Sequence, residues 1–350
     1  MQVSVITPAS ADWQYVLARA PHDFYHLPAY VELSSRTTDQ GEPVGLLVRD
    51  GERALLQAAV LRDIPGESRW RDATSPYGYP GPLLAGAEPS NPFAASALEA
   101  LSAELRSRGV LALFVRLHPL LNEDCSVLGS RGTLVQHGET VVVDLSLPED
   151  ELWRQTQSGH RNEINRARRA GHQVFIDDQW SHYDGFRRLY RETMGRVEAS
   201  SYYFFDDDYF DQLRSALGPR LHLAGVEIGG ALAAAGLFTE VSGVVQYHLS
   251  GMSEAFARER PTKLMLDHVR SWAKSRGNRW LHLGGGLGGA QDSLFRFKAG
   301  FSKLRRAFCT WRLVTDEAAY RRLVAAKHPG AHGDDRTGYF PEYRRPPEPA

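Results

Sequence analysis

The order of strands and helices predicted for residues 172–314 constrains the fold more than any other feature of the sequence. One strand and two amphipathic helices precede three strands joined through tight turns, and a helix, a strand, a short helix and a last strand follow. Strands that succeed one another through short turns pair antiparallel, so we expect a mixed, mostly antiparallel sheet. The strands are predicted at 172–176, 221–227, 232–240, 244–251, 279–283 and 303–314, and the helices at 183–197, 208–217, 261–276 and 293–299.

The first half of the chain has a similar pattern of elements, although the two halves share no residue-level repeat. Its clearest signal is a β-hairpin, in which apolar and polar residues alternate on both sides of the Asp50-Gly51 turn. A loop rich in Gly, Pro and Tyr is predicted at 72–84. Strands are predicted at 3–6, 43–49, 54–63, 110–117, 132–136 and 140–145, and helices at 11–19, 27–35 and 91–108.

A chain of 350 residues suits two domains of ordinary size. We place their boundary near residue 147, before a cation-rich helical segment at 148–169. The element order resembles that of the acetyltransferase (GNAT-type) fold, which binds acyl-CoA in the splay between two strands. We therefore expect an α/β (α+β) protein with two tandem acetyltransferase-like domains, at 1–147 and 148–328, and an irregular Pro- and Gly-rich tail at 329–350.

Composition excludes several classes of protein. A hydrophobic content of 42% and a net charge of -1 give no overall basic field for nucleic acid or membranes. The first ten residues lack the pattern of a signal peptide, and no apolar run is long enough to span a membrane, so we expect a cytoplasmic location. Cys125 and Cys309 are too few for a metal cluster or a disulfide framework, and each is expected to be a small buried hydrophobic residue. Neither a metal nor a tightly bound cofactor is expected.

The segment 280–302, WLHLGGGLGGAQDSLFRFKAGFS, carries the strongest functional signal. Gly284, Gly285, Gly286 and two further glycines let the backbone approach a ligand closely, and the amides of the following helix suit an anion. The alternative is a flexible connection in which Asp292 is an ordinary helix N-cap. The spacing matches neither a Walker loop nor a dinucleotide-binding fingerprint.

Lys298 lies at the end of this helix and is one of only five lysines in a chain with 41 basic residues. Lysine is a compact cation whose pKa shifts readily, so a lysine in an arginine-rich chain is a candidate functional residue. Two interpretations fit its position. One is a cation that the helix dipole favours near the C-terminus, and the other is a charge that stabilises an oxyanion or moves a proton.

Four motifs resemble the FemAB family of aminoacyl-tRNA-dependent transferases: LHLGGG and DSLFRFKAGFS around Lys298, YHLSG at 247–251 and SPYGYPGP at 75–82. The resemblance covers residues 1–315, to within a few positions. It implies tandem acetyltransferase-fold domains, a catalytic position for Lys298 beside Phe297, and an acceptor groove shaped by the loop of Tyr77 and Tyr79. Well-studied members add amino acids from aminoacyl-tRNA to the peptide of a cell-wall precursor.

Two further pairs of residues are candidates. Tyr247 and His248 point to opposite faces of a predicted strand, and one of them is expected to line the groove. His248 has the better intrinsic pKa for a general base, whereas Tyr247 would donate or orient; a buried aromatic side chain is the alternative for either. Arg258 and Arg260 precede a helix that starts at Pro261, where an anion could bind, although both also fit as solvated arginines. The glycine-rich run with which acetyltransferases hold the CoA pyrophosphate is missing here, which favours a different donor.

Arg161 and Arg168 share one face of the helical segment 148–169, next to a second row of arginines. Such a patch suits tRNA phosphates or a substrate diphosphate, although most charged runs are simply solvated helix faces. The helical arm that some family members carry between their halves is not evident in this sequence, which leaves tRNA recognition without a sequence signal.

These features predict an acyltransferase that forms an amide bond. It would move an amino acid from aminoacyl-tRNA, its co-substrate, to an amine of a cell-wall precursor or small metabolite. A second hypothesis is an acyl-CoA-dependent N-acyltransferase that acts on a sugar or metabolite amine. A third is a non-catalytic tandem protein that binds cell-wall precursors or a partner protein.

Overall fold

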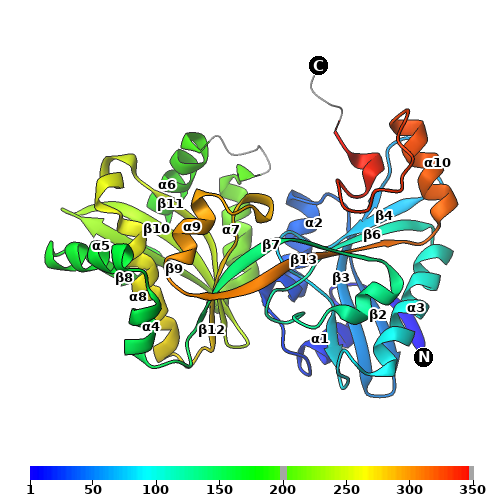
Figure 1. Ribbon diagram of the computed structural model, residues 1–350, viewed down its shortest axis with the longest axis horizontal. Coiled ribbons are helices and arrows are strands. Elements are labelled where there is room, and N and C mark those ends of the chain that lie inside the picture. Colours follow the sequence, from blue (N-terminus) through cyan, green and yellow to red (C-terminus); the bar gives the residue numbers. More distant parts are fainter. Residues whose placement is uncertain (198–202, 347–350) are drawn as a thin grey trace. The chain divides into compact units, whose positions relative to one another are not determined.

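The computed structural model describes residues 1–197 and 203–346, which form two compact units (Figure 1). Unit 1 contains Met1–His137 and Ala307–Ala350, and unit 2 contains Gly138–Arg306. In each unit, helices pack on a mixed and mostly antiparallel set of strands, as the sequence predicts.

In unit 1 the strands lie in the order β1-β2-β3-β4-β6-β13, with β5 beside β3. The predicted hairpin is confirmed: β2 and β3 pair as far as Asp50 and Arg53, and Gly51 has the positive φ, 62°, that the tight turn requires. The strands are β1 (Gln2–Ile6), β2 (Glu42–Asp50), β3 (Arg53–Asp63), β4 (Arg71–Thr74), β5 (Leu83–Ala85), β6 (Val110–Arg116) and β13 (Leu304–Val314). The helices are α1 (Ala11–Leu17), α2 (Pro28–Thr37), α3 (Pro92–Ser107) and α10 (Glu317–Lys327), with short 3-10 turns at Phe24–His26, Ser126–Arg131 and Glu342–Arg344.

In unit 2 the strands lie in the order β7-β12-β11-β10-β9-β8. Helix α8 packs on one face of this sheet and α6 on the other. Glycines in the strands allow both helices to lie close: a Cβ added to Gly236 would lie 3.0 Å from Met265 of α8, and one added to Gly251 would lie 2.3 Å from Leu189 of α6. The strands are β7 (Thr133–Asp144), β8 (Gln173–Ile176), β9 (Leu221–Ile228), β10 (Ala231–Val241), β11 (Val244–Met252) and β12 (Trp280–Gly284). The helices are α4 (Glu149–Gln155), α5 (Ser158–Arg169), α6 (Tyr183–Arg196), α7 (Asp207–Leu217), α8 (Pro261–Ser275) and α9 (Ser293–Ala299), with 3-10 turns at Gly218–Arg220, Glu254–Glu259 and Leu287–Gly289.

The chain passes between the units within two strands, β7 and β13. Strand β7 begins in unit 1, but its residues 141–144 pair with β12 in unit 2. Strand β13 begins in unit 2, but its residues 310–314 pair with β6 in unit 1. Each half of the sequence therefore supplies a strand to the other unit.

The observed units consequently differ from the expected ranges 1–147, 148–328 and 329–350. Unit 1 also takes in α10, which the sequence analysis did not predict, and most of the expected tail. Phe340 and Tyr343 are buried against Tyr320 of α10, with ring centroids 5.9 and 5.4 Å away, whereas Tyr339 is 52% exposed. Aromatic packing thus fixes a segment whose composition suggested no stable structure. Residues 347–350 of the tail lie outside the described residues.

Three predicted boundaries also differ from the structure. The two strands expected at 132–136 and 140–145 are the single strand β7. The helical segment expected at 148–169 is two helices, because Thr156 is extended and the Gln157 amide donates to the Gly300 carbonyl at 2.8 Å. The loop expected at 72–84 includes parts of β4 and β5 at its ends.

Candidate active site

The parallel pair of β11 and β12 is short. Residues 244–246 pair with 280–282, after which β11 continues beside β10 and β12 beside β7. A β-bulge accompanies the separation: Leu237 and Phe238 of β10 face Leu249 and Tyr247, which leaves His248 as the extra residue of β11. We call the opening between residues 247–252 and 283–284 the splay. It corresponds to the place where the element order led us to expect an acyl donor.

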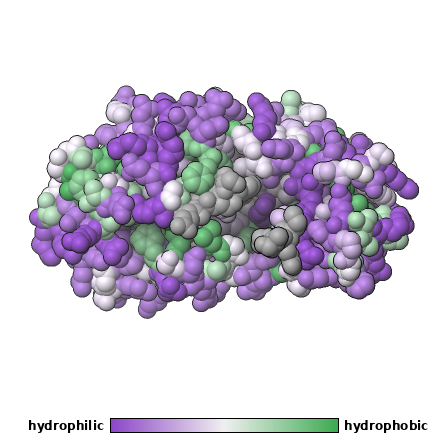
Figure 2. All heavy atoms as spheres, turned by 90° about the horizontal axis from the view of Figure 1, so that it is seen from above, coloured by the Kyte–Doolittle hydropathy of each residue, from purple (hydrophilic) through white to green (hydrophobic). Residues whose placement is uncertain are grey.

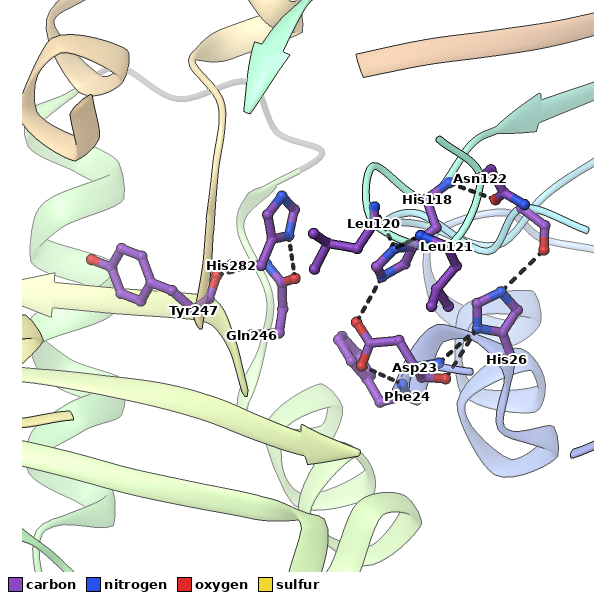
Figure 3. A network of polar contacts seen from close by, with 11 residues as sticks. Asp23, Phe24, His26, His118, Leu120, Leu121, Asn122, Gln246, Tyr247 and His282 are labelled. Carbon is purple, nitrogen blue, oxygen red and sulfur yellow. Dashed lines mark hydrogen bonds and ion pairs between the residues drawn. The ribbon is translucent and has the colours of Figure 1, made fainter. Parts of the chain in front are cut away.

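The two faces of the splay carry different side chains. Tyr247 and Leu283 pack with α5 and α8 in the core of unit 2. Side chains alternate along a strand, so Gln246 and His282 point to the opposite face, where α6 packs. Figure 3 shows Tyr247 directed away from these two residues. The bulge returns Ser250 to the face of Tyr247, and the two hydroxyl groups are hydrogen-bonded.

Lys298 projects from α9 toward the Tyr247 side of the splay. Its Nζ donates to the Gly285 carbonyl at 2.7 Å and lies 5.9 Å from the centre of the Tyr247 ring. Asp292 caps α9, as predicted, by accepting from the amides of Phe295 at 2.8 Å and Leu287 at 3.0 Å. The short α9 helix and the preceding loop together fix the position of the ammonium group.

The glycines before α9 are required by the packing of their own loop. Gly284 has a φ of 77°, in the left-handed region that favours glycine. A Cβ on Gly285 would lie 2.8 Å from the Glu139 carbonyl oxygen, and one on Gly286 would lie 2.1 Å from the Ala290 carbonyl oxygen. This backbone crowding explains why these three positions are glycine. The same loop conformation brings the Gly285 carbonyl to Lys298.

Replacing Asp292 by Ala tests the cap. We expect the free energy of unfolding to fall by about 1 kcal/mol, because two backbone amides lose their acceptor. Chemical denaturation measures this change. Asp292→Asn keeps an equally good capping oxygen and is the control, and Ser293→Ala changes the next, exposed residue. Equal stability of the Ala and Asn variants would show that the cap contributes nothing.

Burial changes the ionisation of all three predicted catalytic residues. Lys298 is 9% exposed, and burial lowers its pKa to about 8, against a smaller opposing effect of Asp292. Burial also raises the pKa of Tyr247 to about 12 and lowers that of His248 to about 3. At neutral pH, Lys298 is therefore mainly charged and the other two are neutral. His248 is thus a weak base, which does not suit the general-base role considered for it.

Phe297 packs inside unit 2. Its ring lies 5.8 Å from the His160 ring and 5.7 Å from the Phe301 ring, between centroids. The His160 Nε2 hydrogen-bonds to the Phe297 carbonyl at 2.9 Å, and glycine at position 300 leaves room for that imidazole. Phe297 therefore anchors α9 to α5, and the sequence analysis did not identify His160 as its partner.

Arg258 and Arg260 lie where the sequence predicts, directly before α8, and both are exposed. The preceding segment forms a 3-10 turn, and Arg260 has a positive φ of 52°. The Arg258 carbonyl accepts from Arg166 at 3.0 Å. Arg258 and Arg260 are thus two cationic residues directly before a 15-residue helix, whose first amides favour an anion.

Arg161 and Arg168, expected to contact nucleic acid, also make contacts inside unit 2. Arg161 donates to carbonyls at the end of α4, including that of Trp153 at 3.3 Å. Arg168 pairs with the fully buried carboxylate of Asp267 and lies 5.4 Å from the Trp153 ring. Both residues have structural roles in joining α5 to its neighbours, and the structure does not bring them to the splay.

Tyr77 and Tyr79 belong to unit 1. Gly78 between them has a φ of 104°, and a Cβ there would lie 1.9 Å from the Tyr25 ring. The loop packs on a buried network that the sequence analysis missed, because His118 lies 95 positions after Asp23 in the chain (Figure 3). In it, His118 hydrogen-bonds to the Asp23 carboxylate at 3.1 Å, and His26 donates to the Gly81 carbonyl at 3.0 Å. Burial lowers the pKa of His26 to about 3, so this residue stays neutral.

The surface gives little additional information about partners. The face in Figure 2 is mainly hydrophilic, with apolar residues in small patches. Leu287 and Leu294, beside the glycine-rich loop, are exposed apolar residues of unit 2. Within 1–197 and 203–346, every helix is too short or too polar to traverse a membrane. The two cysteines are only partly buried, and burial raises the pKa of each.

Comparisons with known proteins agree with this architecture. Residues 154–299, within unit 2, match the Acetyltransferase (GNAT) domain. No curated protein gives a significant match. The chain is similar to the crystal structure of FemX, with a TM-score of 0.68 and 15% identity over 92% of this chain and 99% of FemX. It is also similar to L-PGS from Bacillus licheniformis, with a TM-score of 0.57 and 14% identity over 88% of this chain and 93% of that one.

A third similar structure is the C-terminal domain of a protein named as a lysylphosphatidylglycerol synthetase, from Agrobacterium fabrum. The TM-score is 0.52 and the identity 15%, over 83% of this chain and 92% of that domain. At such identities, these likenesses establish the fold. The chain therefore has two tandem acetyltransferase-like (GNAT) units, an acyltransferase-type fold, and its candidate acyl-transfer site is the splay beside Lys298 in unit 2.

Proposed function

We propose that this protein forms an amide bond by moving an amino acid from aminoacyl-tRNA to an amine of a cell-wall precursor or small metabolite. The observation that carries the proposal is the buried ammonium group of Lys298 at the splay of an acyltransferase-type fold. The likeness to FemX and the motifs shared with its family support the choice of donor.

The chemistry follows from the position of Lys298. The amine attacks the ester carbonyl of the donor, and the electrons of the C=O double bond move to its oxygen. An ammonium group has three N–H donors, one of which is bonded to the Gly285 carbonyl, so two can face the oxyanion. Burial strengthens this interaction, because fewer water dipoles screen the charge. When the C=O bond forms again, the ester C–O bond breaks and the tRNA hydroxyl leaves.

The start of α8 would hold the phosphates of the donor. Arg258 and Arg260 add two charges to the amides of this helix. The 3-10 turn before it contains no glycine, unlike the loop that encloses the CoA pyrophosphate in acetyltransferases. This departure supports a donor with a different phosphate geometry, such as the acceptor end of a tRNA. The likeness to a domain of a protein named as a lysylphosphatidylglycerol synthetase also supports an aminoacyl donor.

An acyl-CoA-dependent N-acyltransferase is the second candidate. The observation in its favour is the match of residues 154–299 to the Acetyltransferase (GNAT) domain. In that case the splay would receive the thioester, and Lys298 would stabilise the same type of oxyanion.

A mass-spectrometric transfer assay separates the candidates. The purified chain is incubated with candidate amines and either charged tRNA pools or acyl-CoAs. We expect an amide product that RNase treatment of the donor abolishes, and that Lys298→Ala forms at least ~100-fold more slowly. Turnover with acyl-CoA alone would overturn the aminoacyl-tRNA proposal in favour of the second candidate. No product with any donor would favour the non-catalytic hypothesis.

The pH dependence of transfer tests the charge of Lys298. Because the protonated amine stabilises the oxyanion, kcat/KM is expected to fall as the pH rises through about 8, the pKa of this residue. Lys298→Arg keeps its charge over this range, so the alkaline decrease should disappear from whatever activity remains. Hydrolysis of the donor without enzyme is subtracted at each pH. An unchanged decrease in the Arg variant would assign it to another group.

A further inference from the structure

A cavity of about 450 Å³ lies in unit 2 where β8 ends and β9 begins. Its walls come from the end of β8 and the loop after it, from α7, and from the first residues of β9 with the turn before them. The splay lies between β11 and β12, so β10 separates the two places in the strand order. A cavity of this volume is within the range of small-molecule sites. It is therefore a second candidate binding site, distinct from the candidate acyl-transfer site.

Four charged or ionisable side chains line the cavity, and two of them already have partners in the protein. The Asp177 carboxylate accepts from the amide and the Nδ1 of His182, at 2.7 and 3.0 Å. The His222 Nε2 lies 3.2 Å from a carboxylate oxygen of Glu240. Burial lowers the pKa of His222, so this imidazole is mainly neutral at neutral pH. These contacts satisfy Asp177 and leave His222 without a charge to offer a ligand.

The other two side chains, those of Asp178 and Arg214, carry opposite charges and are exposed. Within residues 1–197 and 203–346, neither side chain forms a hydrogen bond or an ion pair, with the other or with a third group. The arginine at position 187 of α6 differs, because it pairs with three aspartates, two of them on α7. Asp178 and Arg214 therefore present one negative and one positive group, both unneutralised, to the same cavity.

Trp180 adds an aromatic wall beside Arg214. Its φ of 59° lies in the left-handed region, which is a strained conformation for so bulky a residue. The Trp180 amide donates to the Asp177 carbonyl, and its carbonyl accepts from the Tyr183 amide, both at 3.2 Å. The Arg214 guanidinium lies 4.4 Å from the centre of the indole ring. Backbone strain of this kind is concentrated at functional sites, so the indole at this cavity indicates a role in binding.

We propose that this cavity binds a free amino acid with an apolar side chain. The carboxylate of the amino acid would pair with Arg214 and its ammonium group with Asp178, while its side chain would contact Trp180 and Leu221. A purely anionic ligand would meet the carboxylates of Asp177 and Asp178, and a purely cationic ligand would meet Arg214. A zwitterion matches both signs of charge. The inference concerns binding alone and does not depend on the proposed function.

Isothermal titration calorimetry with L-phenylalanine and L-leucine tests the choice of ligand. We expect saturable binding of at least one of them to the wild-type chain. The matching amines, phenethylamine and isoamylamine, lack the carboxylate, and the matching acids, hydrocinnamate and isocaproate, lack the ammonium group. Each analogue should bind about 10-fold more weakly than its amino acid or not at all, because one charged hydrogen-bonding group is lost. Absence of binding by both amino acids, or equal affinities for an amino acid and its two analogues, would overturn the proposal.

Protein variants test the place of binding. Arg214→Gln and Asp178→Asn should each weaken binding by about 10-fold, and both change exposed side chains, so the fold is expected to persist. Arg188→Gln changes an exposed arginine of α6 that pairs with Glu192 and should bind as the wild type does. Lys298→Ala, at the splay, should also bind normally. Loss of binding in Lys298→Ala would place the amino acid at the splay instead, and unchanged binding in the two cavity variants would equally overturn the site.

Discussion

Lys298→Met is expected to slow acyl transfer strongly and, at the same time, to stabilise the folded protein. Removing an oxyanion donor costs about 10²- to 10³-fold in rate. The gain in stability comes from burial, which lowers the pKa of Lys298 from its ordinary value of 10.5 to about 8. The folded state therefore binds this proton less tightly than the unfolded state. Methionine has a similar length and no charge to bury.

The sign of the effect follows from proton linkage. Below pH 8, Lys298 is charged in both states, and the folded state carries the full cost of burying the charge, on the order of 3 kcal/mol. Between pH 8 and about 10.5 the folded state loses the proton first, so this cost declines and stability rises with pH. Loss of the hydrogen bond to the Gly285 carbonyl offsets part of the gain, which leaves about 1 to 3 kcal/mol at pH 7.

Chemical denaturation of the wild type and Lys298→Met at pH 7 and pH 10, together with the transfer assay, measures both effects. The difference in unfolding free energy should be largest at pH 7 and smaller at pH 10. Lys303→Met changes an exposed lysine five positions away and should alter neither stability nor activity. A destabilised Lys298→Met, or one that transfers at a rate within about 10-fold of the wild type, would contradict the assignment of Lys298 as a buried catalytic cation.

Lys298 illustrates what the sequence could and could not reveal about the site. Its scarcity in an arginine-rich chain and its motif identified the residue, and Asp292 was recognisable as a helix cap from local sequence. The contact with the Gly285 carbonyl, and the burial that lowers the pKa, depend on the fold of a glycine loop. The sequence analysis did not identify the hydrogen bond between the Gln246 amide oxygen and the His282 Nδ1, because the two residues are 36 positions apart on parallel strands. A polar residue between Leu281 and Leu283 was the only local signal.

The fold shows the same division between local and long-range information. The β2–β3 hairpin was predicted because the Asp50-Gly51 turn and the alternation of its strands are local. The exchange of β7 and β13 between the units was not predicted, since the alternation of apolar and polar residues in a strand is the same whichever set of strands it joins. The break between α4 and α5 was not predicted either. There the Gln157 amide donates to the Gly300 carbonyl, 143 positions later in the sequence (300 − 157).

The tail is the largest departure from the sequence-based expectation, and one buried carboxylate explains why it is part of unit 1. Asp72 of β4 is 0% exposed. Its Oδ1 accepts from Arg62 at 2.9 Å, and its Oδ2 accepts from the Tyr343 hydroxyl at 3.2 Å and from Arg344. Burial raises the pKa of the Tyr343 hydroxyl well above its ordinary value, with Asp72 adding to the rise, so this group remains a donor. The carboxylate thus joins the sheet of unit 1 to the 3-10 turn at Glu342–Arg344.

Asp72→Ala is therefore expected to lower the free energy of unfolding of unit 1 by about 3 to 5 kcal/mol, because two guanidinium groups and a buried hydroxyl lose the carboxylate as acceptor. Denaturation and limited proteolysis of the tail measure the loss. Asp63→Ala is the matched control: its carboxylate also pairs with an arginine but is 89% exposed, so the change should be within about 1 kcal/mol. If the tail were the independent irregular segment that its composition suggests, both variants would leave its proteolysis unchanged. Accelerated cleavage in Asp72→Ala alone would instead show that a buried charge, rather than local propensity, holds this Pro- and Gly-rich segment in place.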